Sequence, residues 1–278
     1  MMRRIPDRIL SGVLLLIAAF AWVPARSVAA PMRIVALNPL VAEWTAALLG
    51  DESSSKKIVG VTDYSTWPPV LRPIPTVGPY PKPDVERIAA LKPDLVLASE
   101  EYNRPTTIEP LRRLKLEVKV LSRERFTAFG EWILELGAAL GEPERAEKLR
   151  LEWERELKSL RTGQAVKKSF FLEIQHVPLI TAGGSSFLSE AFEAAGYRNV
   201  FRESGAGYPK VSTESVIRAA PDRIFVLGHE QGELELSQSR KDWERFGKRI
   251  EVLPGDDFAR CSLRLLNALK RLKSQHGP

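Results

Sequence analysis

Two tyrosines and two glutamates recur at matched spacing, and these residue types could bind a ligand and a partner. Tyr80 opens a Tyr-Pro-Lys triplet six positions before Glu86, and Tyr208 opens a second such triplet six positions before Glu214. Each glutamate is followed seven positions later by a Pro-Asp pair, and the two copies are 128 positions apart. A tyrosine offers a large apolar ring with a polar hydroxyl, and a glutamate offers a negative charge. The duplication therefore suggests an aromatic cleft with an acidic rim.

Each copy of this pattern needs a loop, a helix and a strand to position it. Apolar runs follow the two copies at 95–98 and 224–227, and each glutamate falls near the start of a predicted helix. Two lobes related by approximate symmetry would place the tyrosines at facing edges and one glutamate on the rim of each lobe. A simpler interpretation stays open for the glutamates, because the helix dipole favours an acid at a helix start.

The chain alternates strand-like and helix-like segments on both sides of a helical middle. The apolar runs are short and nearly continuous, which is typical of parallel strands that are buried on both faces. This alternation predicts an α/β fold. The expected strands are 33–37, 58–61, 94–98, 117–121, 169–174, 223–227 and 250–253, and the expected helices outside the middle are 42–49, 186–195 and 263–273.

The middle of the chain predicts two helices, and the second is long. It begins near Pro143 and ends near Leu160, with an apolar stripe that includes Ala146, Trp153 and Leu157. About eighteen helical residues span roughly 27 Å, which is enough to bridge two lobes. An ordinary surface helix is the open alternative. We expect an N-terminal lobe at 30–125, connecting helices at 126–162 and a C-terminal lobe at 163–278.

The first 29 residues are typical of a secretory signal peptide. Arg3, Arg4 and Arg8 form a basic region, and an apolar stretch from about residue 9 to residue 23 follows. Small residues then lead to Ala29, after which cleavage is expected, with cleavage after Ala30 as the alternative. We therefore expect export to the periplasm.

Composition excludes several classes of function. The net charge is +6, of which +3 lies in the signal segment, and no dense basic run suggests nucleic-acid binding. The single cysteine, Cys261, cannot form an internal disulfide and lies too far from the N-terminus to carry a lipid anchor. No nucleophile elbow, phosphate loop or paired-histidine metal helix is present, so we do not expect an enzyme.

The chain resembles a known family along nearly its whole mature length. Its sequence is similar to the periplasmic substrate-binding proteins of ABC importers for cobalamin, iron-siderophores and haem, and most similar to the cobalamin binders. The segments that carry this resemblance are Val59-Gly60-Val61, Tyr64, Pro68-Pro69, Glu86-Arg87-Ile88, Leu91-Lys92-Pro93-Asp94-Leu95-Val96, Tyr208-Pro209, Val211-Ser212, Glu214, Pro221, Asp256, Phe258, Arg260, Ser262 and Arg264.

The resemblance implies a fold of two Rossmann-like lobes joined by a single long connecting helix. It also implies a monomer without a cofactor that holds cobalamin between the lobes and delivers it to a membrane permease. By resemblance, Glu86 and Glu214 dock on permease arginines. Where the cobalamin binders carry tryptophans, this chain has Tyr80, Tyr208 and Ser99. The ligand-binding residues that the resemblance implies are Tyr64, Tyr80, Tyr208, Phe258 and Arg260.

Two other ligand classes stay open. A cleft tyrosine could ligate haem iron, and Arg260 or Lys210 could pair with the carboxylates of haem or of a ferric siderophore. A receptor for a free metal ion would need several converging His, Asp or Glu ligands. Of the three histidines, only His176 and His229 are candidates for such a site.

Overall fold

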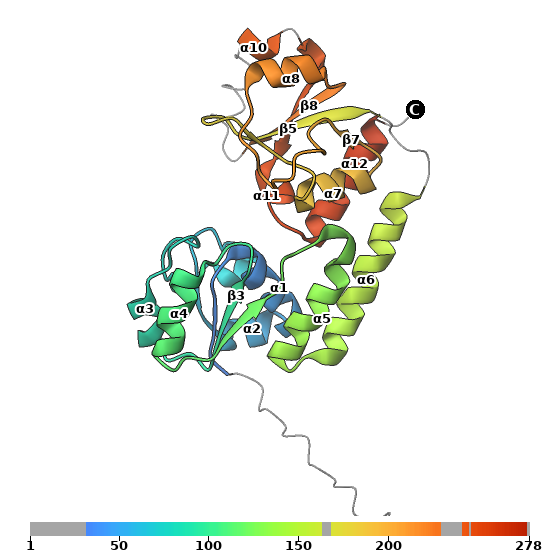
Figure 1. Cartoon of the computed structure of the whole chain (residues 1–278). Coiled ribbons are helices and arrows are strands. Elements are labelled where there is room, and N and C mark those ends of the chain that lie inside the picture. Colours follow the sequence, from blue (N-terminus) through green and yellow to red (C-terminus); the bar gives the residue numbers. More distant parts are fainter. Residues whose placement is uncertain (1–31, 163–167, 229–240, 245, 277–278) are drawn as a thin grey trace, which may run out of the picture.

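The computed structural model describes residues 32–162, 168–228, 241–244 and 246–276, which form two α/β lobes (Figure 1). The N-terminal lobe is coloured blue to green and the C-terminal lobe yellow to red. The predicted signal peptide, 1–29, and His229 lie outside the described residues. Among the described helices, none combines the length and the apolar character that a membrane span requires.

The N-terminal lobe is built on a parallel sheet with the strand order β2-β1-β3-β4. Alternate residues of β1 point to opposite faces, so that Ile34 joins the core that contains helix α1, whereas Val35 packs with α3 and α4 residues. The elements are β1 (Ile34–Ala36), α1 (Pro39–Leu49), α2 (Asp51–Lys57), β2 (Ile58–Val61), α3 (Val85–Ala90), β3 (Leu95–Ser99), α4 (Pro105–Arg113) and β4 (Val118–Leu121).

The C-terminal lobe repeats this plan with a partly different edge. Its sheet has the order β6-β5-β8-β9, in which β8 is parallel to β5 and β9, β6 is antiparallel, and β7 also pairs with β5. Its elements are β5 (Ser169–Gln175), β6 (Ile180–Thr181), α7 (Phe187–Ala194), β7 (Arg198–Asn199), α8 (Thr213–Ala219), β8 (Arg223–Gly228), α10 (Lys241–Glu244), β9 (Ile250–Pro254), α11 (Gly255–Phe258) and α12 (Leu263–His276).

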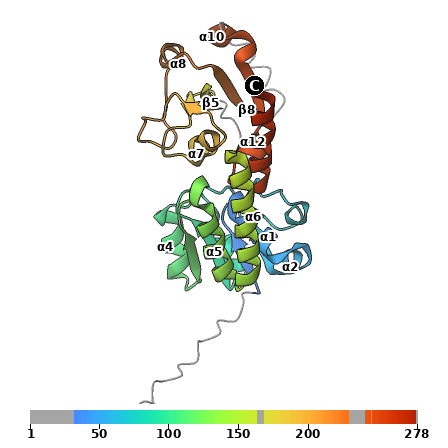
Figure 2. The same cartoon turned by 90° about the vertical axis from the view of Figure 1, so that its right-hand side faces the viewer.

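The long helix predicted in the middle of the chain is α6 (Pro143–Arg161), and it follows α5 (Phe129–Leu140). The two helices pack tightly, since a Cβ atom at Gly137 would lie only 2.2 Å from that of Ala146. In Figures 1 and 2, α6 rises from the side of the N-terminal lobe toward α12 of the C-terminal lobe. Lys273 of α12 donates to the carbonyl of Leu160 at 2.7 Å. Helix α6 therefore connects the lobes, as the sequence predicted.

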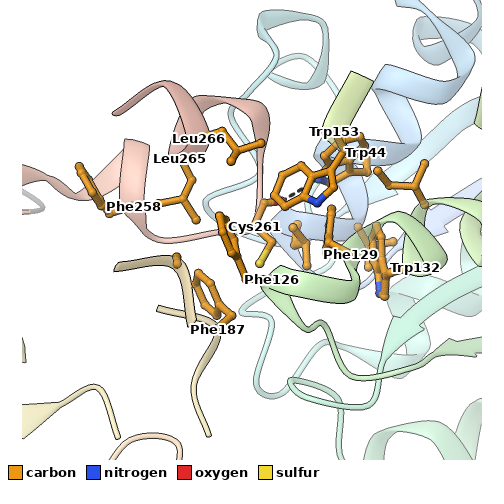
Figure 3. Close-up of a cluster of buried hydrophobic side chains, with 14 of the residues drawn as sticks. Trp44, Phe126, Phe129, Trp132, Trp153, Phe187, Phe258, Cys261, Leu265 and Leu266 are labelled. Carbon is orange, nitrogen blue, oxygen red and sulfur yellow. Dashed lines mark hydrogen bonds between the residues drawn. The ribbon is translucent and has the colours of Figure 1, made fainter. Parts of the chain in front are cut away.

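A hydrophobic seam continues from one lobe into the other. Figure 3 shows rings from α1, α5 and α6 converging with side chains of the C-terminal lobe around Cys261. The indole nitrogen of Trp44 donates to the backbone carbonyl of Cys261 at 2.8 Å, which ties α1 to the segment before α12. Each large apolar side chain buried in this seam contributes on the order of 1.5–3 kcal/mol, so the seam favours one arrangement of the lobes.

The internal repeat has a structural meaning in both sheets. Strands β3 and β8 occupy the same position in the order of their sheets. Just before β3, Asp94 Oδ2 accepts hydrogen bonds from the backbone nitrogens of Met32 and Arg33, each at 3.0 Å. Just before β8, Asp222 Oδ2 accepts from the backbone nitrogen and the hydroxyl of Ser169, each at 2.7 Å. The repeated Pro-Asp pair thus fastens the start of the neighbouring strand in each lobe.

Candidate ligand-binding cleft

A cavity of about 500 Å³ lies at the carboxyl ends of strands from both lobes. Its N-terminal wall follows β1, β2 and β3, and its C-terminal wall follows β9. Ligands of open α/β sheets bind at this edge, because the loops that leave the strands converge there. The lining residues are Asn38, Pro39, Leu40, Tyr64, Thr66, Tyr80, Tyr102, Asp256, Ala259 and Arg260.

Tyr64 stands at the exposed part of this wall. It follows β2 and has a φ of 66°, a left-handed conformation that few residues other than glycine adopt. Its side chain is 75% exposed. The turn is fastened to the Tyr80 loop by the Asp63 nitrogen, which donates to Gly78 at 3.0 Å. The unusual backbone thus presents a large ring that is free to cover a ligand.

Tyr80 and Tyr102 form the inner part of the wall. Their rings meet edge to face, with centroids 5.9 Å apart and planes at 89°. The buried amide of Asn103 donates to the carbonyls of Tyr80 and Leu37, each at 3.3 Å, and accepts from the Ser99 nitrogen at 2.9 Å. Asn103 therefore holds the Tyr80 loop against the ends of β1 and β3.

Tyr102 was not predicted as a site residue. It follows β3 by three positions, at the same edge of the sheet as Tyr64 after β2. The position after a buried parallel strand was the one signal that could have identified it.

Arg260 lines the cavity from the C-terminal lobe, and its guanidinium group is already paired with a carboxylate. Its Nε donates to Glu43 Oε2 of α1 at 3.2 Å, and Arg264 donates to the same oxygen at 2.9 Å. Glu43 is 8% exposed, so this three-residue cluster is largely shielded from water. The cluster joins the lobes beside the cavity and leaves Arg260 with less charge to offer an anionic ligand.

Tyr208 does not line the cavity, but its hydroxyl lies close enough to Tyr102 of the lining to raise the pKa of that residue. It is half-buried and packs against the main core, and burial raises the pKa of its hydroxyl well above the usual range, with Glu124 as the next cause. Its loop is held by two backbone hydrogen bonds, from Gly183 to Gly207 at 2.8 Å and from Thr181 to Pro209 at 3.1 Å. The segment from Thr181 to Gly183 therefore supports the Tyr208 loop.

Phe258 faces the core in this structure. It is 2% exposed, and its ring lies 5.8 Å from that of Phe192 in α7. The structure thus brings Tyr64, Tyr80 and Arg260 together around the cavity, places Tyr208 next to it, and keeps the ring of Phe258 out of the lining.

Glu86 and Glu214 are both exposed and both occupy the second position of their helices, α3 and α8. Each helix is capped by the residue before its first position, namely Asp84 and Ser212. The pKa of Glu214 is lowered by its own backbone N–H and by the Ser212 hydroxyl. Both glutamates are therefore accessible negative charges at equivalent helix starts, and neither lines the cavity.

The described histidines make pairwise contacts rather than a metal cluster. His176 Nδ1 lies 2.9 Å from Glu173 Oε1, and His276 Nδ1 lies 2.7 Å from the Tyr197 hydroxyl. Within the ranges that the structure describes, no three His, Cys, Asp or Glu side chains converge in a way that could hold a metal ion.

Comparison with known proteins decides the family. The family described as periplasmic binding protein matches residues 34–244. The chain belongs to the periplasmic binding protein family. The vitamin B12-binding protein of Salmonella choleraesuis is 31% identical over 261 residues, which cover 92% of this chain and 94% of the relative. That of Pectobacterium carotovorum is 28% identical over 272 residues, covering 96% and 93% respectively.

Solved structures agree with the fold. The vitamin B12 binding protein BtuF of Vibrio cholerae matches with a TM-score of 0.75 at 26% identity, covering 88% of this chain and 96% of that one. A periplasmic heme binding protein of Pseudomonas aeruginosa matches with a TM-score of 0.76 at 25% identity, covering 88% and 92%. Membership of this family of binding proteins confirms that the chain is not an enzyme and that its compartment is the periplasm.

Proposed function

We propose that this periplasmic binding protein captures cobalamin, or a related corrinoid, between its lobes and delivers it to the permease of an ABC importer. The observation that carries the proposal is the cavity between the lobes, whose inner wall is made of tyrosines. The relatives named as vitamin B12-binding proteins align over more than nine-tenths of the chain, so they support the same ligand class.

A corrinoid is a wide, flat ring system with peripheral amide groups, and such a ligand needs broad aromatic and apolar surface with a few polar anchors. Tyr64, Tyr80 and Tyr102 supply rings with hydroxyls, which can pack against the ring system and hydrogen-bond to amides. Asp256 and Arg260 stand opposite as the polar anchors. Since Glu43 and Asp256 together match the positive charges of Arg260 and Arg264, this wall suits a ligand with little negative charge.

The experiment that tests this proposal is a co-elution assay. The purified protein is incubated separately with cobalamin, haem and a ferric siderophore, then desalted, and the absorption spectrum of the protein fraction is read. The proposal expects the cobalamin spectrum to co-elute in stoichiometric amount. Retention of haem or siderophore alone would contradict it.

Haem is the second candidate. A tyrosine phenolate can ligate haem iron, and the cleft wall carries three tyrosines. The heme binding protein of Pseudomonas aeruginosa supports this alternative through its 25% identity. The pairing of Arg260 with Glu43, a carboxylate that Arg264 shares, argues the other way, because haem propionates call for an arginine that is not already paired.

Delivery requires a docking surface away from the ligand, and we assign this role to Glu86 and Glu214. Both are exposed, and they lie one per lobe at equivalent helix starts. Exposed charges at an interface steer association and set its orientation, so two separated acids could align both lobes on a basic permease surface. We also propose that the segment 1–29 directs export and is cleaved after Ala29.

A further inference from the structure

A buried acid that the sequence did not single out lies behind the tyrosine wall. Glu124 follows β4, where the chain leaves the N-terminal lobe, and it is only 5% exposed. Its polar neighbours include Tyr102, which lines the cavity, and Ser99. The side chains of Tyr102 and Ser99 lie close enough to lower the pKa of the Glu124 carboxyl, although neither carboxylate oxygen has a hydrogen bond of normal geometry among the described residues. The carboxyl group is buried behind Tyr102 and does not line the cavity, so it can act on an occupant of the cavity through its charge but not by direct contact.

No described basic residue balances this acid. Arg123, one position earlier, pairs with Glu101 at 2.9 Å, and Arg125, one position later, pairs with Glu190 at 2.8 Å. The other groups that face Glu124 add no positive charge either, because they are the Tyr102 and Tyr208 hydroxyls, the Cys261 thiol and the Glu101 carboxylate. An acid without a basic partner among the described residues therefore lies behind the inner wall of the cleft.

The opposite wall does not offset this charge. Glu43 is shared by Arg260 and Arg264, and Asp256 adds a second carboxylate, so the two negative and two positive charges of this wall cancel. Burial raises the pKa of Glu124 to about 7, so that near neutral pH the side chain is partly ionised in a poorly solvated place. A ligand carboxylate brought to the same wall would meet like charge in a medium of low effective dielectric, where such repulsion is strong. A neutral amide in that position would meet no such repulsion.

We propose that Glu124 is a specificity-determining residue of the cleft, which disfavours ligands that bring a carboxylate to the inner wall and so selects metal complexes with neutral amide side groups. The inference rests on the proposed function, since it takes the corrinoid to occupy the cavity beside Tyr102. It extends that function by assigning the rejection of carboxylate-bearing complexes to one side chain.

The test uses ligands that differ in one group. Cyanocobalamin is compared with its monocarboxylic acids, in each of which one peripheral amide of the corrin has been hydrolysed to a carboxylate. Affinities are measured by titration calorimetry at about pH 8, where a carboxyl group of pKa near 7 is mostly ionised. The wild-type protein should bind at least one of the acids roughly tenfold more weakly than cyanocobalamin, which is the size expected for like charges about 8 to 10 Å apart near a protein surface. The variant Glu124→Gln should lose most of that preference, measured as the ratio of its affinities for cyanocobalamin and for the same acid.

Two further variants keep the result interpretable. Glu124→Leu removes the charge with a side chain of similar size and should lose the preference as Glu124→Gln does, which guards against a folding defect in one of them. Glu131→Gln makes the same change of net charge on the exposed face of α5 and should behave as wild type. Wild-type binding without any preference, or a preference that both Glu124 variants retain for every acid, would overturn the inference and leave the proposed function standing. Failure of the wild type to bind cyanocobalamin would overturn both.

Discussion

At the scale of single residues, the cleft depends on tyrosines whose positions are set by polar neighbours. Tyr80 is held at its backbone by the Asn103 amide and at its ring by Tyr102. Tyr64 owes its exposure to a left-handed backbone turn. The rings are therefore already in position before a ligand binds, which lowers the entropic cost of ordering them on binding.

Replacing Tyr80 with alanine should weaken ligand binding without unfolding the protein. A ring packed against a large ligand contributes on the order of 1–3 kcal/mol, which corresponds to a loss of affinity of roughly 5- to 150-fold. Titration calorimetry with cyanocobalamin measures the change, and Tyr80→Phe, which keeps the ring, serves as the matched control. Unchanged affinity in both Tyr80→Ala and Tyr208→Ala would remove these two loops from the ligand-binding site.

Glu124 should make the stability of the protein depend on pH. Burial raises its pKa from the ordinary value of 4.5 to about 7. Between these two values the unfolded chain has lost the proton that the folded chain still holds, so stability falls as the pH rises through this window. The penalty is on the order of 3 kcal/mol once the pH exceeds the folded pKa.

The variant Glu124→Gln removes this titration. It should therefore unfold at a higher temperature than wild type at about pH 8, while the two proteins should differ little at about pH 5. Thermal unfolding followed by circular dichroism at both pH values checks this. Equal melting temperatures at about pH 8 would mean that Glu124 is hydrated rather than buried.

At the scale of elements, the sequence predicts those helices and strands that a pattern of apolar residues marks. Strands β1, β3, β5 and β8 are buried on both faces, so their continuous apolar runs marked them, and Pro143 with the stripe through Trp153 marked α6. Helices α2 and α4 were not predicted. Helix α2 has no apolar periodicity, and helix α4 contains Pro110, which suggests a break in a helix. Tyr102 and Glu124 were not predicted as site residues, because their roles depend on contacts with residues that are distant in the sequence.

The loop that carries Tyr208 should be sensitive to a methyl group at Gly183. A Cβ atom there would lie 2.0 Å from the Ala206 carbonyl oxygen, so the loop that holds Tyr208 would have to move. Overpacking of this kind costs on the order of 1–3 kcal/mol. Gly183→Ala should therefore lower the melting temperature and weaken ligand binding.

Gly205→Ala is the matched control on the same loop, because no atom lies within 4 Å of the added Cβ. It should leave both the melting temperature and the affinity near the wild-type values. Equal behaviour of the two alanine variants would show that the packing of this loop on Gly183 does not position Tyr208.

At the scale of the whole molecule, the lobes share a connecting helix and a continuous hydrophobic seam. Trp44 reaches across to Cys261, and Glu43 pairs with both Arg260 and Arg264, so α1 contacts the C-terminal lobe through apolar and charged groups. This construction limits independent movement of the lobes and keeps the exposed acids of α3 and α8 in a fixed relation. A rigid body with one acid on each lobe suits docking on a membrane partner.

Transport and binding should respond differently to loss of the two exposed glutamates. Because neither side chain lines the cavity, the double variant Glu86→Ala with Glu214→Ala should bind cyanocobalamin with unchanged affinity. Uptake through the cognate permease should fall sharply, since losing charged partners at an interface can cost several kcal/mol. Arginine at both positions should be worse than alanine. Normal uptake by the double alanine variant would reduce both glutamates to ordinary helix-start residues.

The most direct measurement is a calorimetric titration of the wild-type mature protein with cyanocobalamin, accompanied by the same titration with haem. We predict saturable binding of one cyanocobalamin per chain, weakened about fivefold or more by Tyr80→Ala. We also predict weaker binding of haem, because the carboxylates of haem would approach the acid Glu124 behind the inner wall. Saturable binding of haem together with no measurable binding of cyanocobalamin would contradict the proposed function.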